Sequence, residues 1–108
     1  MVYYHVTLLK NWPSIKQNGL LPLISKRSEE MGESVPAVYL FTSRTSMNEA
    51  LCQWLGDWYE TEYGEEVKLC SLEVTLDQAF PLVSSEAAYE ILSLSKIPPG
   101  MIKFLQEE

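Results

Sequence analysis

The chain is poor in the residues that build metal centres and disulfide frameworks. Its 108 residues contain one histidine, His5, and two cysteines, Cys52 and Cys70, which lie far apart in the sequence. A structural zinc site needs closely spaced Cys and His ligands, and a disulfide scaffold needs more than two cysteines. The sequence therefore predicts no metal site. We expect both cysteines to be buried free thiols of a protein that works in a reducing compartment, the cytoplasm.

Long apolar runs and cationic side chains are also scarce. No stretch approaches the roughly 20 apolar residues that a membrane-spanning helix needs, so we expect a soluble protein with no membrane partner. Eight Lys and Arg stand against 15 Asp and Glu, which gives a formal net charge of -7 at pH 7. This acidity disfavours nucleic acid as a partner, because nucleic-acid affinity depends on cations that neutralise phosphates. A dinucleotide is not disfavoured, since it needs only one or two well-placed cations and some backbone donors.

The first half of the chain alternates strand and helix signals within one predicted domain, residues 1–108. In the opening strand, His5 and Thr7 fall on the same face by alternation. The expected elements are a strand over 2–7, a helix from Asn11 to Gly19 with Pro13 in its first turn, a strand over 20–25, a mobile loop over 26–34 and a strand over 37–42.

The second half predicts one long helix followed mainly by strands. Ser46 and Glu49 form a capping box that opens this helix, and Gly64 ends it. Its expected buried stripe is Met47, Leu51, Trp54, Leu55 and Trp58. The further expected elements are a strand over 68–75 with one buried side, strands over 80–83 and 89–94, and a terminal turn or short helix through Phe104. The pattern indicates an α+β fold with antiparallel or mixed sheets and two to three helices.

Three residues on separate expected strands carry candidate chemistry. The imidazole of His5 offers one donor and one acceptor, which suits a ribose hydroxyl, although a packed strand histidine is the alternative. Tyr39 lies in a Val-Tyr-Leu-Phe run, where its ring either stacks on a ligand ring or packs in the core. Glu90 shares a largely apolar face with Leu92 and Leu94, and a carboxylate there is costly unless it has a partner or a task.

The order His5, Tyr39 and Glu90, with an opening helix from Asn11 to Gly19 and an Ile-Pro-Pro run at 97–99, resembles the ADP-ribosyltransferase superfamily in its His-Tyr-Glu branch. The amino-terminal part is similar to the DNA-targeting ADP-ribosyltransferase toxins, which have a comparable His-x-Thr and helix. The resemblance implies a small α+β fold with a split sheet and NAD bound as a substrate. No glycine precedes the strand of Tyr39 and no second tyrosine completes an aromatic sandwich, for which Trp54 is a possible substitute.

The resemblance also implies a role for each matching residue. Glu90 takes the catalytic position, binding the ribose 2′-hydroxyl and stabilising the oxocarbenium-like state as nicotinamide leaves. Glu86 is a competitor for that role, and Glu73 is a weaker one. His5 is both catalytic and NAD-binding.

The remaining implied contacts concern NAD alone. Thr7 would lie beside His5 on the nucleotide, and Tyr39 would stack on nicotinamide. Ser43 is a candidate partner of the carboxamide, although serine at a strand end is more often a turn or cap residue. Arg27 and Arg44 are candidate partners of the pyrophosphate, although surface arginine is the more common reading of each.

The implied function is NAD-dependent mono-ADP-ribosyl transfer to a protein or small-molecule acceptor, with no metal. One alternative is a non-catalytic module of the same fold that binds a nucleotide or a protein. A second alternative is a nucleic-acid-modifying relative such as an RNA 2′-phosphotransferase, which the negative charge disfavours.

Overall fold

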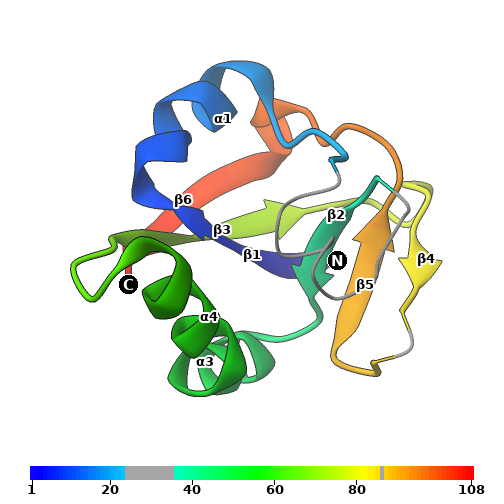
Figure 1. The fold of residues 1–108 in the computed structure, drawn as a ribbon. Coiled ribbons are helices and arrows are strands. Elements are labelled where there is room, and N and C mark those ends of the chain that lie inside the picture. Colours follow the sequence, from blue (N-terminus) through cyan, green and yellow to red (C-terminus); the bar gives the residue numbers. More distant parts are fainter. Residues whose placement is uncertain (24–35, 86) are drawn as a thin grey trace.

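The computed structural model describes residues 1–23, 36–85 and 87–108, and it confirms the predicted α+β fold class (Figure 1). In these residues six strands form one antiparallel sheet in the order β4-β5-β2-β1-β3-β6. The elements are β1 (Val2–Leu8), η1 (Leu9–Asn11), α1 (Trp12–Asn18), β2 (Val38–Phe41), α3 (Arg44–Cys52), α4 (Trp54–Tyr63), β3 (Leu69–Thr75), β4 (Val83–Ser84), β5 (Glu90–Ser93), η2 (Pro99–Met101) and β6 (Ile102–Glu107).

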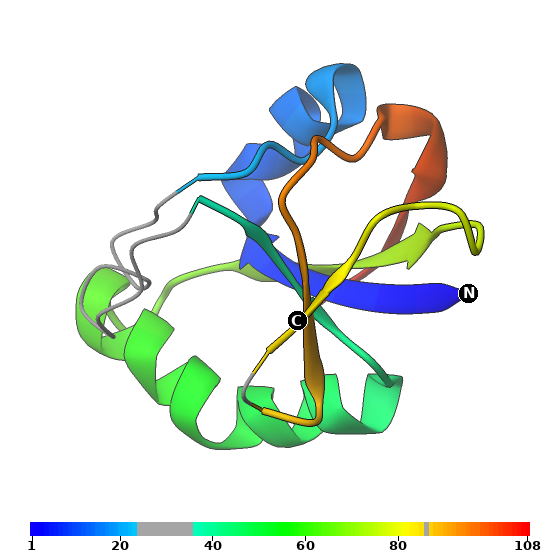
Figure 2. The ribbon, with the colours of Figure 1, turned by 90° about the vertical axis from the view of Figure 1, so that its right-hand side faces the viewer.

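The sheet is continuous on one side of β1 and split on the other. β1 pairs with β3 along its whole length, from Val2 opposite Thr75 to Leu8 opposite Leu69. Its pairing with β2 is confined to Tyr4 opposite Phe41. Beyond that pair the two strands separate, so β2 and β5 cross β1 at a steep angle (Figure 2). The two halves of the sheet therefore meet at one point and leave a gap on the side of α1 and α4.

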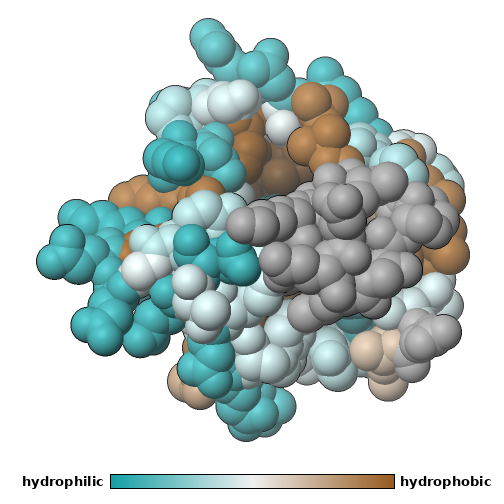
Figure 3. Space-filling model, in the orientation of Figure 1, coloured by the Kyte–Doolittle hydropathy of each residue, from teal (hydrophilic) through white to brown (hydrophobic). Residues whose placement is uncertain are grey.

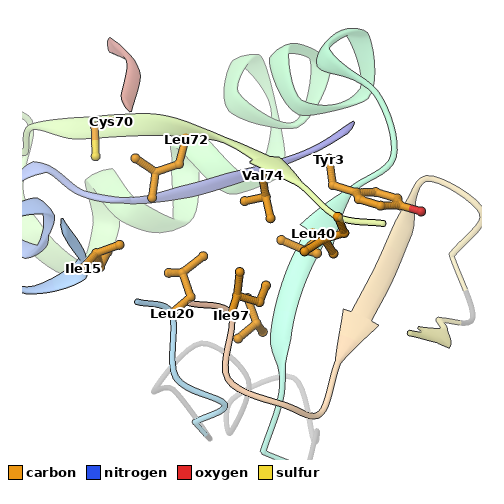
Figure 4. Close-up of a cluster of buried hydrophobic side chains, with 10 residues drawn as sticks. Tyr3, Ile15, Leu20, Leu40, Cys70, Leu72, Val74 and Ile97 are labelled. Atoms are coloured by element: carbon orange, nitrogen blue, oxygen red, sulfur yellow. The ribbon is translucent and has the colours of Figure 1, made fainter. Parts of the chain in front are cut away.

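Helices cover both faces of the sheet, so the molecule has three layers (Figure 2). On the face toward α1, a core cluster includes Ile15, Leu20 and Ile97, which lie against Leu40 and Leu72 of the strands (Figure 4). On the other face, a second cluster packs α3 and α4 against the sheet. Its buried members are Val6, Leu8, Phe41, Met47, Ala50, Leu55, Tyr59 and Leu69. None of the helices in the described ranges is long and apolar enough for a membrane span.

Gly19 ends α1 as predicted and joins it to the carboxy-terminal half of the chain. Its φ of 82° lies in the region that favours glycine, and its amide donates to the carbonyl of Ile15. Leu20 and Ile97 then exchange two backbone hydrogen bonds of 2.9 Å. A β-carbon on Gly19 would collide with the Ile97 carbonyl oxygen. The sharp exit at Gly19 therefore lets the end of α1 dock on residues 97–99.

The predicted long helix is wrong in two respects. Gln53, with φ of -127° and ψ of -117°, interrupts it and separates α3 from α4. The helix also starts earlier than the predicted box at Ser46, because the Ser43 hydroxyl accepts from the Ser46 amide and caps α3. As a result, Met47 and Leu55 are fully buried, whereas the other predicted stripe residues are only partly buried.

Several predicted strand boundaries also need correction. The carboxy terminus forms the edge strand β6, where a turn or short helix was predicted. The strand predicted over 80–83 is limited to β4, and the one predicted over 20–25 is reduced, in its described part, to single bridges at Leu20 and Leu23. β3 is buried on both faces rather than one, because α3 and α4 cover Leu69 and the Glu108 carboxylate accepts from the buried Ser71 hydroxyl. The predicted loop over 26–34 lies outside the described residues.

The two cysteines differ, which corrects the expectation that both are buried. Both are free thiols, but Cys52 is exposed at the end of α3, whereas Cys70 is buried in β3. Burial raises the pKa of Cys70 to about 11, with smaller contributions from the negative charges of Glu108 and Glu107. Cys70 is therefore a neutral, unreactive core residue at physiological pH.

We predict that a thiol reagent at pH 8 modifies only Cys52 in the folded protein and both cysteines in denaturant.

Because the folded pKa of Cys70 lies above its ordinary value of 9.0, its contribution to stability is complete below pH 9 and is lost as the pH rises toward 11. Urea unfolding of a Cys52→Ala background with and without Cys70→Ala measures this loss. Parallel pH profiles of the two variants would contradict the prediction.

We predict that Gly19→Ala lowers the free energy of unfolding by at least about 1–2 kcal/mol, because the left-handed backbone penalises a β-carbon and the Ile97 carbonyl must also move. Gly100→Ala is the matched control, since a β-carbon there meets no atom within 4 Å and φ is not positive. We expect the control to stay within about 1 kcal/mol of wild type. Equal stability of the two variants would show that the α1 exit imposes no constraint.

Candidate functional site

A cavity of about 380 Å³ lies where β1 and β2 separate. Its volume falls in the range of small-molecule sites. In the space-filling view an apolar hollow beside α1 is bordered by hydrophilic residues (Figure 3). The described residues that line the cavity are His5, Val6, Thr7, Leu8, Asn11, Ser14, Ile15, Gly19, Leu20, Leu21, Leu23, Ala37, Val38, Tyr39, Trp58, Tyr59 and Tyr63. They include members of both core clusters, so the cavity lies in the gap between the two halves of the sheet.

His5 bridges this gap. Its Nδ1 lies 2.8 Å from the backbone oxygen of Tyr39. The Thr42 amide donates to the carbonyl of Tyr89, the residue before β5, and ladder bonds alternate sides along an antiparallel strand. The Tyr39 carbonyl, three residues before Thr42, therefore points toward β1. The described pairing of β1 with β2 is confined to Tyr4 and Phe41, and beyond that pair the imidazole of His5 connects the two strands. This hydrogen bond joins the imidazole on β1 to the backbone of β2 at the point where the two strands separate.

The bond to Tyr39 also determines the tautomer of His5. A carbonyl oxygen can only accept, so Nδ1 must carry the hydrogen and donate. In the neutral imidazole the other nitrogen, Nε2, is then an acceptor. His5 therefore offers the ligand-binding side of the ring a fixed acceptor, which suits a hydroxyl donor.

The β1 and α1 side of the cavity is polar. Thr7 lies on the same face of β1 as His5, as predicted, and both residues line the cavity. Asn11 and Ser14 line it from η1 and α1. The Asn11 amide donates to the Thr7 hydroxyl oxygen at 3.2 Å. This side therefore presents neutral hydrogen-bonding groups, and none of the described lining residues is charged Lys, Arg, Asp or Glu.

The opposite side of the cavity is aromatic. Tyr39 contributes from β2, and Trp58, Tyr59 and Tyr63 contribute from α4. The three α4 rings contact one another, with centroids 5.1–6.1 Å apart. Trp54, the substitute considered from the sequence, is not among the described lining residues. α4 begins after the helix break at Gln53. Trp58, one helical turn after Trp54, lines the cavity instead of Trp54.

Glu90 lies at the start of β5, outside the described lining of the cavity. Glu90 is opposite Phe41 on β2, and Leu92 is opposite Tyr39, so Glu90 and Tyr39 are diagonal neighbours on one face of the sheet. Phe41 packs against α3 and α4, so this is the face that these helices cover. Diagonal neighbours of this kind are about 7–8 Å apart. Tyr4 is paired with Phe41 and shares its face, so the side chain of the next residue, His5, projects from the opposite face of the sheet. The Ser85 hydroxyl donates to Oε1 of Glu90 at 3.1 Å.

The other sequence candidates are placed away from the described cavity or outside the described residues. Ser43 caps α3 and also donates to the Ser46 hydroxyl, the alternative that its position at a strand end favoured. Arg44 donates to the Gln106 side chain on β6. Glu73 lies on β3, opposite Lys103 of β6. Arg27 and Glu86 lie outside the described residues.

Sequence reasoning missed Asn11 and Ser14 as cavity residues and assigned Trp58 to the core. Asn11 was interpreted as a helix cap, but its side chain makes no cap hydrogen bond in the structure. Tyr59 and Tyr63 gave a usable signal, because they follow Trp58 at positions i+1 and i+5 on an aromatic-rich helix. That signal was ambiguous, since the same spacing is typical of a core stripe.

No residues of the described ranges form a group of His, Cys, Asp and Glu that could hold a metal ion. Comparisons of the chain with protein-family models, with curated proteins and with solved structures give no match. The interpretation of the cavity therefore depends on its own residues and geometry.

The His5 bridge can be tested without any ligand. We predict that His5→Ala lowers the free energy of unfolding by about 0.5–1.5 kcal/mol, because it removes the hydrogen bond to the Tyr39 carbonyl. His5→Asn keeps an amide donor near the position of Nδ1, so we expect it to recover at least half of that loss. Chemical unfolding of the three proteins measures both effects. Equal losses in the two variants would contradict the bridging role.

Proposed function

We propose that the protein is an NAD-consuming mono-ADP-ribosyltransferase that acts on a protein or small-molecule acceptor. The observation that carries the proposal is the meeting of His5, Thr7 and Tyr39 at one cavity in a split sheet. These are three of the residues to which the family resemblance gives NAD contacts. His5 and Thr7 are neighbours on one face of β1, whereas Tyr39 comes from β2, more than thirty residues later, so its meeting with them was not fixed by sequence proximity. The expected compartment remains the cytoplasm.

The described residues suit the parts of NAD in different ways. Nε2 of His5 accepts from a ribose hydroxyl, and Thr7 lies beside it on the same strand. Tyr39 and the α4 aromatics offer flat apolar surface for the nicotinamide ring. The absence of acidic side chains among the described lining residues avoids repulsion of the pyrophosphate.

In the proposed reaction the glycosidic bond between ribose C1′ and the nicotinamide nitrogen breaks. Nicotinamide leaves with the bonding electron pair, and positive charge develops on the ribose. In this proposal the Glu90 carboxylate, which accepts from the Ser85 hydroxyl, binds the 2′-hydroxyl and stabilises this charge. Because Glu90 lies outside the described cavity lining and on the other face of the sheet from His5, the role requires the ribose to extend from the cavity toward the start of β5. A nucleophile of the acceptor then forms the new bond to C1′ and loses its proton.

A second candidate function is a binding module that holds a nucleotide without consuming it. The position of Glu90 favours this candidate, because the carboxylate is a strand away from His5 and lies outside the described lining of the cavity. A nucleic-acid-modifying function finds no support in the described cavity wall, which contains no Lys or Arg. Release of nicotinamide distinguishes catalysis from binding.

We predict that Glu90→Gln lowers the rate of nicotinamide release from NAD by about a hundred- to a thousandfold and leaves NAD affinity nearly unchanged. Glutamine keeps the shape and accepts from Ser85, but it lacks the charge that the transition state needs. Glu73→Gln on β3 removes the same charge away from the cavity and is the matched control. Its turnover is expected to equal that of wild type.

Three outcomes change the assignment. Unchanged turnover in Glu90→Gln with a large loss in Glu86→Gln would transfer the catalytic role to Glu86. NAD binding by wild type without nicotinamide release, in the presence of candidate acceptors, would support the binding module. No binding of NAD would refute the function and leave the fold unaffected.

A further inference from the structure

Asn11 has an unusual role for a residue at the start of a helix. It occupies the N-cap position of α1, yet its side chain makes no cap hydrogen bond. Instead its Nδ2 reaches back four residues and donates to Oγ1 of Thr7 at 3.2 Å. Both residues line the cavity. The amide therefore supports a cavity residue at the expense of the helix end.

This contact limits what the Thr7 hydroxyl can do. A hydroxyl has one hydrogen and two acceptor lone pairs. Because Oγ1 accepts from Asn11, its hydrogen points away from the amide and is available as a donor in another direction. We propose that the Thr7 hydroxyl donates to a phosphate oxygen of the nucleotide and that Asn11 is the positioning residue that sets this polarity. This inference rests on the proposed function and adds a residue and a direction to it.

The Thr7 donor complements the His5 acceptor. The two residues share a face of β1 and are two positions apart, which places their α-carbons about 6.6–6.8 Å apart. One wall therefore presents an acceptor for a hydroxyl next to a donor for an oxygen. A ribose with a nearby phosphate offers this pair of groups. A hydroxyl donor to an ionised phosphate gives the stronger, charge-assisted hydrogen bond, and this wall has no described cation that would otherwise bind the phosphate.

The experiment measures affinity by calorimetry for three ligands: ADP-ribose, nicotinamide mononucleotide and nicotinamide riboside. The last two differ by one phosphate. Thr7→Val removes the hydroxyl and keeps the shape, whereas Thr7→Ser keeps the hydroxyl. Asn11→Ala removes the supporting donor. Asn11→Asp replaces it by a carboxylate, which accepts from Thr7 and turns its hydrogen away from the ligand. Asn18→Asp adds the same charge to an exposed position of α1 outside the described cavity lining and is the matched control.

We expect Thr7→Val to weaken ADP-ribose and nicotinamide mononucleotide by roughly ten- to a hundredfold and nicotinamide riboside by less than about twofold. Thr7→Ser should restore most of the affinity. Asn11→Ala should weaken the phosphate-bearing ligands by about two- to tenfold, and Asn11→Asp should weaken them more than both Asn11→Ala and Asn18→Asp. Thermal unfolding of each free variant separates these effects from loss of the fold.

Two results would overturn the inference alone. If Asn11→Asp and Asn18→Asp weaken binding equally, Asn11 sets no polarity at Thr7. If Thr7→Val weakens the mononucleotide and the riboside equally, the acceptor is a ribose or carboxamide oxygen and not a phosphate. Failure of wild type to bind any of the three ligands would instead overturn the proposed function together with this inference.

Discussion

The hydrogen bond from His5 Nδ1 to the Tyr39 carbonyl is the interaction on which the site depends. The sheet is held together at its centre by one pair, Tyr4 opposite Phe41, and beyond it β1 and β2 separate. Where the two strands separate, the imidazole of His5 reaches across the gap to the backbone of β2. The same bond fixes the ring tautomer and directs an acceptor to the cavity. The cavity and its most informative polar residue thus have one physical origin.

Local signals predicted the elements well where the pattern depended on neighbours in sequence. The alternating strand β1, the strand β2 with its many β-forming residues and the left-handed Gly19 are confirmed. The errors come from contacts between distant segments. Strand β6 was missed because its pairing partner β3 lies some thirty residues earlier in the chain. The burial of β3 on both faces was missed because it depends on the carboxy-terminal Glu108, which accepts a hydrogen bond from Ser71. No periodicity within either segment encodes such contacts.

The site was predictable in part for the same reason. Alternation placed His5 and Thr7 on one face, and the family resemblance supplied Tyr39, all of which line the cavity. No local pattern indicates the helix break at Gln53, after which α4 brings its aromatic residues to the cavity. The sequence also could not distinguish a capping Asn11 from one that contacts Thr7, because both uses suit the same position before a helix.

We propose that the split between β1 and β2 is a nucleotide site with His5 as its hydrogen-bond acceptor. A crystal structure of the protein with a non-hydrolysable NAD analogue tests it most directly. We expect the analogue between the two halves of the sheet, with a ribose hydroxyl within hydrogen-bond distance of His5 Nε2 and the nicotinamide ring against Tyr39 and the α4 aromatics. A ligand bound elsewhere, or an imidazole that donates rather than accepts at Nε2, would contradict it.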